Sequence, residues 1–175
     1  CADGGVDKLL SLEFIPDLIL GDFDSLSRKP SDYSYDFIYL PDQSKNDLEK
    51  SLEWCCEKNI EKLSLVGFSG KRDDHNMATL FLLAEYSEKM DLILYTNHST
   101  IVCINGQREF DSLAGQEISM ISLLPPTIIT ADGLKFPIKD TSLDSTTRGI
   151  SNIAKGSRFS INANGPVWVF LNHTE

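Results

Sequence analysis

The sequence predicts an α/β domain followed by an all-β domain, because strands that alternate with helices give way to strands alone. Four short apolar runs in the first hundred residues have the length of buried strands: 18–20, 37–40, 63–66 and 91–95. Helical patterns lie between them. After residue 98, β-type runs follow one another, and Asn105-Gly106 and Asn164-Gly165 are expected turns between them. The change of pattern predicts one domain at residues 1–98 and a small antiparallel β domain at 99–175.

Two helices are expected in the first domain. The clearer one spans residues 46–58, where Asn46 and Glu49 have the spacing of a capping box and apolar residues recur at helical intervals. The second spans residues 74–89, and the side chains expected to face its core are Met77, Leu80, Phe81 and Ala84.

The charge of the chain is uneven. The net charge is −10, and residues 1–100 carry 19 acidic against 10 basic side chains. An excess of acids argues against nonspecific nucleic-acid binding and suits a site for metal cations or a cationic substrate. No apolar run approaches the roughly 20 residues of a membrane span. No signal peptide is visible, and the four cysteines have no metal-binding spacing, so we expect reduced thiols and a cytoplasmic location.

Two aspartates, Asp22 and Asp24, follow the apolar run 18–20 and Gly21. In an extended chain their carboxylates would lie on one side, about 6–7 Å apart. Their repulsion would be roughly 2.5 kcal/mol at an effective dielectric constant near 20. A divalent cation would turn this repulsion into attraction. The alternative is that Asp22 only solvates the strand end, while Asp24 or Ser25 caps a helical turn.

Three further features have both a functional and a structural interpretation. Asp3-Gly4-Gly5 allows close backbone approach to a ligand, or is only a turn. Asp47 lies in the first turn of the helix at 46–58, where the helix dipole alone favours an acid. The loop Gly70-Lys71-Arg72, which leads into the second helix, is either a phosphate cradle or a solvated loop tip. It lacks the spacing of a Walker A loop.

Several motifs in chain order resemble those of the thiamin pyrophosphokinase family. In the first half they are Asp3-Gly4-Gly5, the segment from Pro16 to Ser25, the segment from Gln43 to Lys50, and the loop from Gly70 to His75. In the second half they are the segments from Asp132 to Ile138 and from Arg148 to Asn152. Together they extend over nearly the whole chain. Phe136 stands where the family often has Trp or Tyr, and Asn46 where Thr is common.

The resemblance implies transfer of the β,γ-pyrophosphoryl group of ATP to the hydroxyl of thiamin, giving thiamin diphosphate and AMP. It implies a Rossmann-like α/β domain with a mostly parallel sheet and a C-terminal β-sandwich. It also implies a homodimer in which thiamin lies between the α/β domain of one subunit and the β domain of the other.

The resemblance further assigns roles to individual residues. The implied Mg²⁺ ligands are Asp22, Asp24 and Asp47, and the catalytic set adds Arg72 and Asp74. The implied ATP contacts are Asp3, Gly4, Gly5, Gln43, Lys71, Arg72 and His75. The implied thiamin contacts are Gln43, Phe136, Ser151 and Asn152, with Phe136 stacking on the pyrimidine.

Two alternatives stay open. One is another Mg²⁺-dependent nucleotide phosphotransferase or hydrolase with a different acceptor, and the other is a non-enzymatic β-sandwich binding module. Convergence of Phe136, Ser151 and Asn152 on one pocket facing the acidic cluster would favour thiamin. The chain begins with Cys1 and Ala2, followed by Asp3-Gly4-Gly5, and we expect the first strand to begin upstream of Cys1.

Overall fold

The structure is a computed structural model that describes residues 1–70, 72–124, 126–143 and 147–174. The chain forms two compact units, residues 1–60 and 61–175, each with its own core. Every helix among the described residues is too short or too polar to cross a bilayer.

The first unit is built on a parallel pair of strands, β1 (Leu18–Gly21) and β2 (Asp36–Tyr39). Its helices are α1 (Gly5–Ser11), the 3-10 turn η1 (Pro30–Asp32) and α2 (Asp47–Glu57). The predicted cap of α2 is confirmed, because the Asn46 side chain accepts a hydrogen bond from the Glu49 N–H at 2.9 Å. Ala2 forms a parallel bridge with Leu20, so the chain before α1 runs beside β1.

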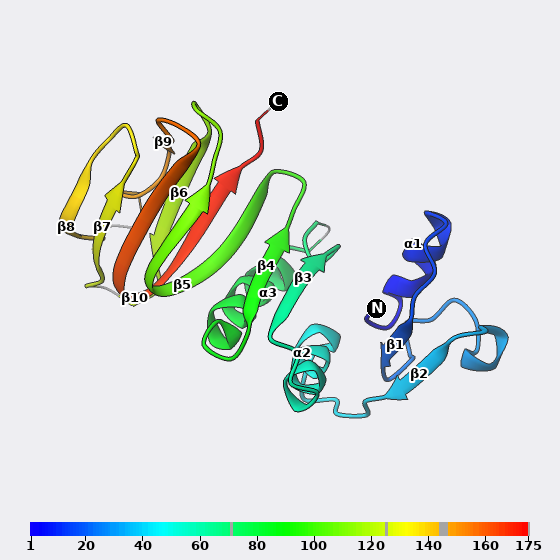
Figure 1. Cartoon of the computed structure of the whole chain (residues 1–175). Helices are drawn as coiled ribbons and strands as arrows, with labels where there is room; N and C mark the ends of the chain where they lie inside the picture. Colours follow the sequence, from blue (N-terminus) through cyan, green and yellow to red (C-terminus); the bar gives the residue numbers. More distant parts are fainter. Residues whose placement is uncertain (71, 125, 144–146, 175) are drawn as a thin grey trace. The chain divides into compact units, whose positions relative to one another are not determined.

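The second unit contains one long helix and eight strands among its described residues. The helix is α3 (Asp73–Tyr86), which packs on β4, β5 and β10 (Figure 1). The strands are β3 (Lys62–Val66), β4 (Asp91–Tyr95), β5 (Ser99–Asp111), β6 (Glu117–Ser122), β7 (Ile128–Asp132), β8 (Ile138–Ser142), β9 (Asn152–Ile153) and β10 (Arg158–Asn172).

These strands form one mixed sheet in the order β3-β4-β5-β10-β6-β9, with β7 paired to β10 and β8 to β7. Only β3 and β4 are parallel among the described pairs of this sheet. The mostly parallel sheet expected for residues 1–98 is not formed by the described strands, which instead make two separate parallel pairs. A short turn at Thr96–His98 joins β4 to β5, and a link of this length can only make neighbouring strands antiparallel. The boundary expected at residues 98/99 lies in this turn.

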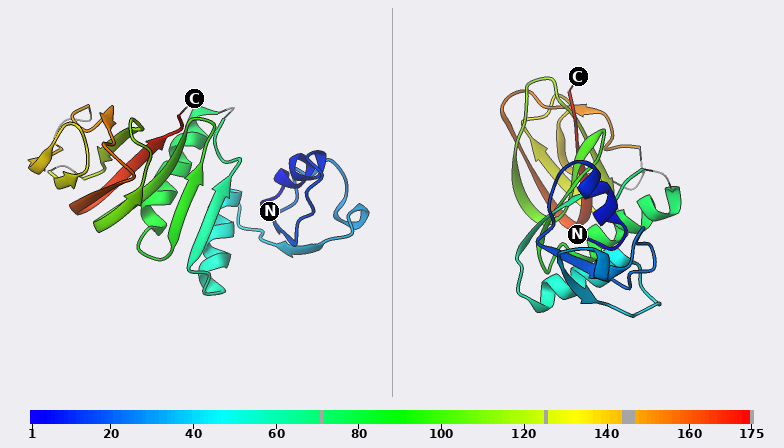
Figure 2. Two further views of the ribbon diagram at one scale, coloured as in Figure 1. Left: turned by 45° about the horizontal axis from the view of Figure 1, so that its top comes forward. Right: turned by 90° about the vertical axis from the view of Figure 1, so that its right-hand side faces the viewer.

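Two turns expected from sequence are absent. Asn105-Gly106 lies within the continuous strand β5, and Asn164-Gly165 lies within β10. β5 and β10 run side by side over twelve residue pairs (Figure 2), with a register shift between Ala163 and Val167. The two pairs of turn-forming residues fall at this irregularity, where regular pairing is interrupted without ending either strand.

The buried face of α3 also differs from the expectation. Its buried side chains are Thr79, Leu82, Leu83 and Tyr86. Met77 and Phe81 are exposed, and the Phe81 ring instead lies edge-on to Trp168 of β10. Apolar residues occur on several sides of this helix, so spacing alone does not select a face.

Candidate active site

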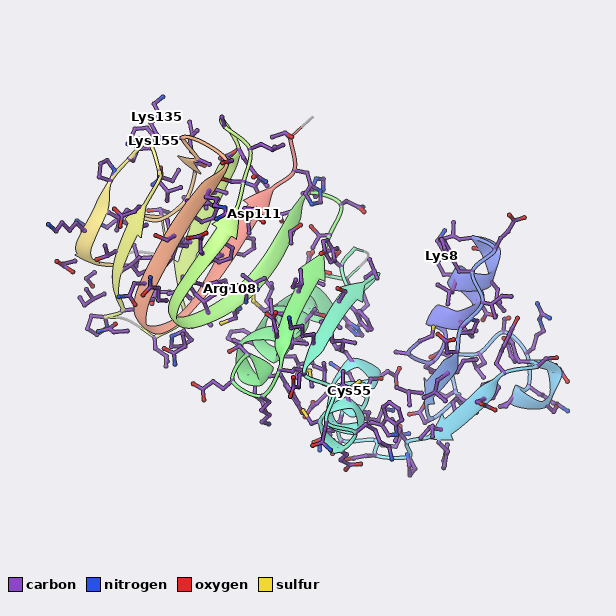
Figure 3. The ribbon with its side chains drawn as sticks, viewed as in Figure 1. Lys8, Cys55, Arg108, Asp111, Lys135 and Lys155 are labelled. Carbon is purple, nitrogen blue, oxygen red and sulfur yellow. The ribbon has the colours of Figure 1, made fainter. Side chains whose placement is uncertain are left out.

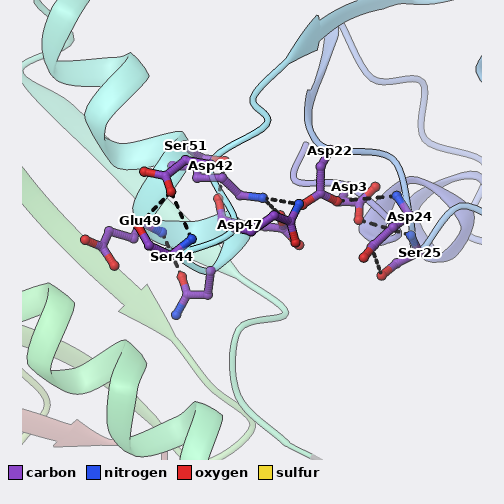
Figure 4. Close-up of polar contacts among 12 residues, drawn as sticks. Asp3, Asp22, Asp24, Ser25, Asp42, Ser44, Asp47, Glu49 and Ser51 are labelled. Carbon is purple, nitrogen blue, oxygen red and sulfur yellow. Dashed lines mark hydrogen bonds and ion pairs between the residues drawn. The ribbon is translucent and has the colours of Figure 1, made fainter.

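Three carboxylates of the first unit meet at the carboxyl end of β1 (Figure 4). Asp22 and Asp24 follow the strand, and Asp3 follows the neighbouring segment, whose Asp3 N–H donates to the Leu20 carbonyl at 2.7 Å. Because parallel segments end at the same edge, residues nineteen positions apart become neighbours. Gly21 makes this approach possible, since a Cβ there would lie 2.8 Å from the Asp3 Cβ.

The cluster has the donor set of a hard divalent cation. One carboxylate oxygen from each of Asp3, Asp22 and Asp24 lies within 4.8 Å of the others. Asp3 is only 1% exposed, and its Oδ1 is buried without a hydrogen-bond partner. Burial, with the nearby carboxylates, raises the pKa of Asp3. A buried unpaired carboxylate oxygen calls for a partner, and Mg²⁺ prefers such oxygens, so these residues fit the ion.

The backbone between Asp22 and Asp24 is not extended, which differs from the extended chain expected from the sequence. Phe23 has a φ of +68°, in the left-handed region. This conformation is uncommon for a bulky residue and costs about 1–3 kcal/mol. The Phe23 ring packs edge-on against Phe37 at 5.0 Å between centroids, a contact that contributes about 0.5–1.5 kcal/mol against this strain. The turn therefore brings the two carboxylates closer than an extended chain would.

A lysine that the sequence reasoning did not select, Lys50 of α2, completes the cluster. Its ammonium lies 2.8 Å from Asp22 Oδ2 and 2.7 Å from Asp47 Oδ1, and its side chain is 4% exposed. Gln43 donates to the same Asp22 oxygen at 2.8 Å. The Lys50 contact lowers the pKa of Asp22. Asp22 Oδ2 thus accepts hydrogen bonds from Lys50 of α2 and from Gln43, which precedes that helix. Asp22 Oδ1 faces Asp24, whose N–H lies 3.4 Å away.

Asp47 is joined to Asp22 through Lys50 rather than belonging to the group of three. The signal for this arrangement was present in the sequence, because Asp47 and Lys50 have the i, i+3 spacing of a helical ion pair. What the spacing did not indicate was the second carboxylate, Asp22, which is 28 residues away.

Gly4 and Gly5, expected at an ATP site, have separate local roles. Gly4 lies close to the chain at Ser25, where an added Cβ would be 2.7 Å from the Ser25 carbonyl. Gly5 begins α1, which is seven residues long.

In the second unit, Arg72 and Asp74 form an ion pair at the start of α3. The Arg72 guanidinium holds the pKa of Asp74 well below its usual range, at about 2. Both side chains are exposed, as is His75. The loop is closed by Asn76, whose side chain accepts from the Gly70 N–H at 2.9 Å. Lys71, expected to contact ATP, lies outside the described residues.

Phe136, Ser151 and Asn152 line one cavity of about 320 Å³ in the second unit. Its other lining residues are Pro137, Ile138, Thr141, Leu143, Arg148 and Ile150. The Phe136 ring is 55% exposed, Ser151 is exposed, and Asn152 is buried. Ser151 has a φ of +58°, and its N–H donates to Ser119 Oγ at 3.0 Å. An aromatic face and polar groups that converge on one cavity are typical of a small-molecule site.

Family models match both parts of the chain. One, described as thiamin pyrophosphokinase, catalytic domain, matches residues 1–94. Another, described as thiamin pyrophosphokinase, substrate-binding domain, matches residues 100–170.

Individual relatives agree with these matches. Thiamin pyrophosphokinase 1 of Caenorhabditis elegans is 28% identical over 157 residues, which cover 81% of this chain and 65% of that protein. Thiamine pyrophosphokinase of Bacillus subtilis is 27% identical over 183 aligned positions, which cover 87% of this chain and 82% of that protein. The chain thus spans just under two thirds of the length of the C. elegans relative.

Solved structures share the fold. The crystal structure of the B. subtilis enzyme superimposes with a TM-score of 0.85 at 24% identity, covering 99% of this chain and 86% of that one. Thiamin pyrophosphokinase from Candida albicans superimposes with a TM-score of 0.83 at 18% identity, covering 99% of this chain and 81% of that one.

Proposed function

The chain belongs to the thiamin pyrophosphokinase family, and we propose that the protein transfers the pyrophosphoryl group of ATP to the hydroxyl of thiamin, giving thiamin diphosphate and AMP. The observation that carries the proposal is the cavity shared by Phe136, Ser151 and Asn152. These residues come from two segments that resemble the thiamin-side motifs of the family, and fifteen positions separate Phe136 from Ser151.

Thiamin has two parts that the chain can recognise. Its pyrimidine is flat and aromatic, which suits stacking on the half-exposed Phe136 ring. The Ser151 hydroxyl is the proposed hydrogen-bond partner at the edge of the cavity. The thiazolium of thiamin is permanently cationic, which suits a chain whose first hundred residues carry an excess of acids.

The carboxylate cluster is the proposed Mg²⁺ site, with Asp22 and Asp24 as ligands and the unpaired Asp3 oxygen beside them. Asp47, the third ligand that the family resemblance implies, is paired with Lys50 and would bind the ion only by exchanging that partner. Mg²⁺ bound there would neutralise the phosphate oxygens of ATP. The chain's own contribution is orientation. Gln43 and Lys50 hold one oxygen of Asp22, so that its other oxygen is presented in a fixed direction.

The loop before α3 is the proposed phosphate contact. Arg72 carries a planar cation suited to bidentate binding of phosphate oxygens, and Asp74 holds that cation in place through their ion pair. The N-terminus of α3 adds backbone N–H donors at the same end. Phosphoryl-type transfer depends on positioning and charge neutralisation, which these groups supply.

Three further features are part of the proposal. The catalytic α/β domain is assigned to residues 1–98 and the thiamin-binding β-sandwich to 99–175, supported by family models that end at 94 and begin at 100. Two copies would form a homodimer, each completing the thiamin site of the other. A cytoplasmic location is supported by the four cysteines, none of which is in a disulfide.

The test is an assay of purified full-length protein with ATP and Mg²⁺, with and without thiamin, following AMP and thiamin diphosphate. We expect AMP release only when thiamin is present. AMP release that does not depend on thiamin would favour another phosphotransferase or hydrolase. Absence of both activity and Mg²⁺-dependent nucleotide binding would favour a binding module.

A variant of the cluster sharpens this test. Asp24→Asn should lower turnover by about 100-fold or more while changing thermal stability little, because Asp24 is exposed and its side chain bonds only Ser25 among the described contacts. The matched control is Asp111→Asn at the exposed end of β5 (Figure 3), where the carboxylate is 91% exposed. The control should keep full activity. Equal loss of turnover and stability in Asp24→Asn would make Asp24 structural.

A further inference from the structure

The side chain of Asn152 is bonded to the peptide of Phe136. Its Oδ1 accepts from the Phe136 N–H at 3.0 Å, and its Nδ2 donates to the Phe136 carbonyl at 2.8 Å. The same Oδ1 also accepts from the Ile153 N–H at 2.9 Å. The residue is 4% exposed, so although it lines the cavity, both polar atoms of its amide are already used in hydrogen bonds within the protein.

These bonds extend a ladder between two segments. Leu134 and Ala154 form an antiparallel bridge, with Lys135 N–H donating to the Ile153 carbonyl at 2.7 Å and Lys155 N–H to the Gly133 carbonyl at 2.8 Å. Lys135 and Lys155 project from these paired segments at one end of the unit (Figure 3). At the next position the partner is the Asn152 side chain, which supplies one donor and one acceptor as a peptide would.

Asn152 is itself anchored in the core. In β9 it pairs with Ile118 of β6, which is fully buried. The segment just before Asn152 is also bonded to β6, because the Met120 N–H donates to the Gly149 carbonyl at 2.8 Å. A Cβ at Gly149 would lie 2.4 Å from the Met120 carbonyl, so this contact requires glycine. The Phe136 backbone is thus tied through Asn152 to a buried strand.

The described interactions of the Phe136 ring include only an exposed cation, the Lys135 ammonium 5.6 Å from the ring centroid, so the backbone tie is its main restraint. The ring is 55% exposed and lies between a lysine and a proline in the loop that joins β7 to β8. A loosely held ring loses freedom when a ligand stacks on it, whereas a fixed ring does not.

From these contacts we infer that Asn152 is a positioning residue, which holds the Phe136 ring ready to stack on the pyrimidine of thiamin. It acts through Phe136 and not by contact with the substrate, which differs from the role that the family resemblance implied. The inference rests on the proposed function, since it concerns the ligand of the same cavity.

The test is a double-mutant cycle on thiamin affinity, measured by calorimetry on the full chain. Phe136→Ala removes the stacking face and Asn152→Ala removes the tie. We expect Asn152→Ala to weaken thiamin binding by about 3- to 10-fold, and to add nothing in the Phe136→Ala background. Additive losses would mean that Asn152 touches thiamin directly and would overturn the inference. An unchanged affinity in Asn152→Ala would overturn it as well.

The matched control is Ser151→Ala, whose side chain lines the same cavity. Its effect should add to that of Phe136→Ala, because its proposed bond is made to the substrate. Asn152→Asp is a second variant that keeps the Oδ1 acceptor but places a carboxylate oxygen against the Phe136 carbonyl, where the amide donated. It should fold with a wild-type far-UV spectrum and weaken thiamin binding at least as much as Asn152→Ala, because the tie is replaced by a repulsion.

A readout without ligand separates this inference from the proposed function. Amide hydrogen exchange at Phe136 should be slow in the wild type and at least 10-fold faster in Asn152→Ala, while exchange at Ile118 stays unchanged. Equal rates at Phe136 would overturn the positioning role whatever the ligand. If the exchange result holds and the wild type binds no thiamin, the proposed function fails and the tie remains.

Discussion

Replacing Lys50 by methionine removes the cation that joins Asp22 and Asp47 while keeping an unbranched apolar side chain of nearly the same length. The ammonium makes two close contacts, at 2.8 Å and 2.7 Å, in a site where its side chain is 4% exposed. Removing one partner of a buried ion pair costs about 3–5 kcal/mol, because the remaining charge stays buried without compensation. Asp47 is 35% exposed and is partly rescued by water, so the lower end of this range is expected.

The assay is thermal unfolding followed by circular dichroism at pH 7. A loss of about 3 kcal/mol corresponds to a fall in Tm of about 6–12 °C for a chain of this size. The control is Lys45→Met on the approach to α2, where the lysine contacts Glu53 at a more exposed site. Exposed pairs contribute about 0–1 kcal/mol. If Lys50→Met and Lys45→Met lowered the Tm equally, Lys50 would not be the cation that holds the cluster.

Further predictions concern the other charges of the first unit and one core contact of the second. Asp3→Asn should raise the Tm at pH 7, because it removes a buried, unpaired charge that costs about 1 kcal/mol. It should also abolish Mg²⁺ binding measured by calorimetry. A lower Tm would contradict the observation that Asp3 Oδ1 has no hydrogen-bond partner. Because Lys50 lowers the folded pKa of Asp22 below its ordinary 3.8, the stabilisation is present above pH 3.8 and is lost as the pH falls through the folded pKa. The wild-type Tm should therefore fall more steeply below pH 3.8 than that of Asp22→Asn, and parallel curves would contradict this. Trp168→Phe removes the indole N–H that donates to the Leu80 carbonyl at 2.9 Å, and should cost about 1–2 kcal/mol in urea unfolding; an unchanged midpoint would show that this bond contributes nothing.

Local patterns predicted the elements of the chain well. The cap at Asn46, the helix that follows it and the short strands of the first half are all present near their expected positions. Each depends on residues within one turn or one strand of each other, and that is the range over which periodicity and capping carry information.

Partners that lie far apart in the sequence were not predictable in this way. The Asn105-Gly106 pair has the composition of a hairpin turn, but twelve pairings between β5 and β10 outweigh this local preference. The apolar residues of α3 offered more than one possible buried face, and only packing on β4, β5 and β10 selected Leu82 and Leu83.

The same division applies to the candidate site. Motifs in the sequence predicted the residues of the proposed site, because Asp22, Asp24 and Phe136 lie in segments that resemble those of the thiamin pyrophosphokinase family. Only the tertiary structure shows which polar atoms of these residues are free to bind a ligand and which already have partners within the protein. Lys50 occupies one oxygen of Asp22, and the amide of Asn152 is bonded to the Phe136 peptide. A polar atom bonds whichever group folding brings within about 3 Å of it. For partners far apart in the sequence, the spacing of residues along the chain does not reveal which group that is.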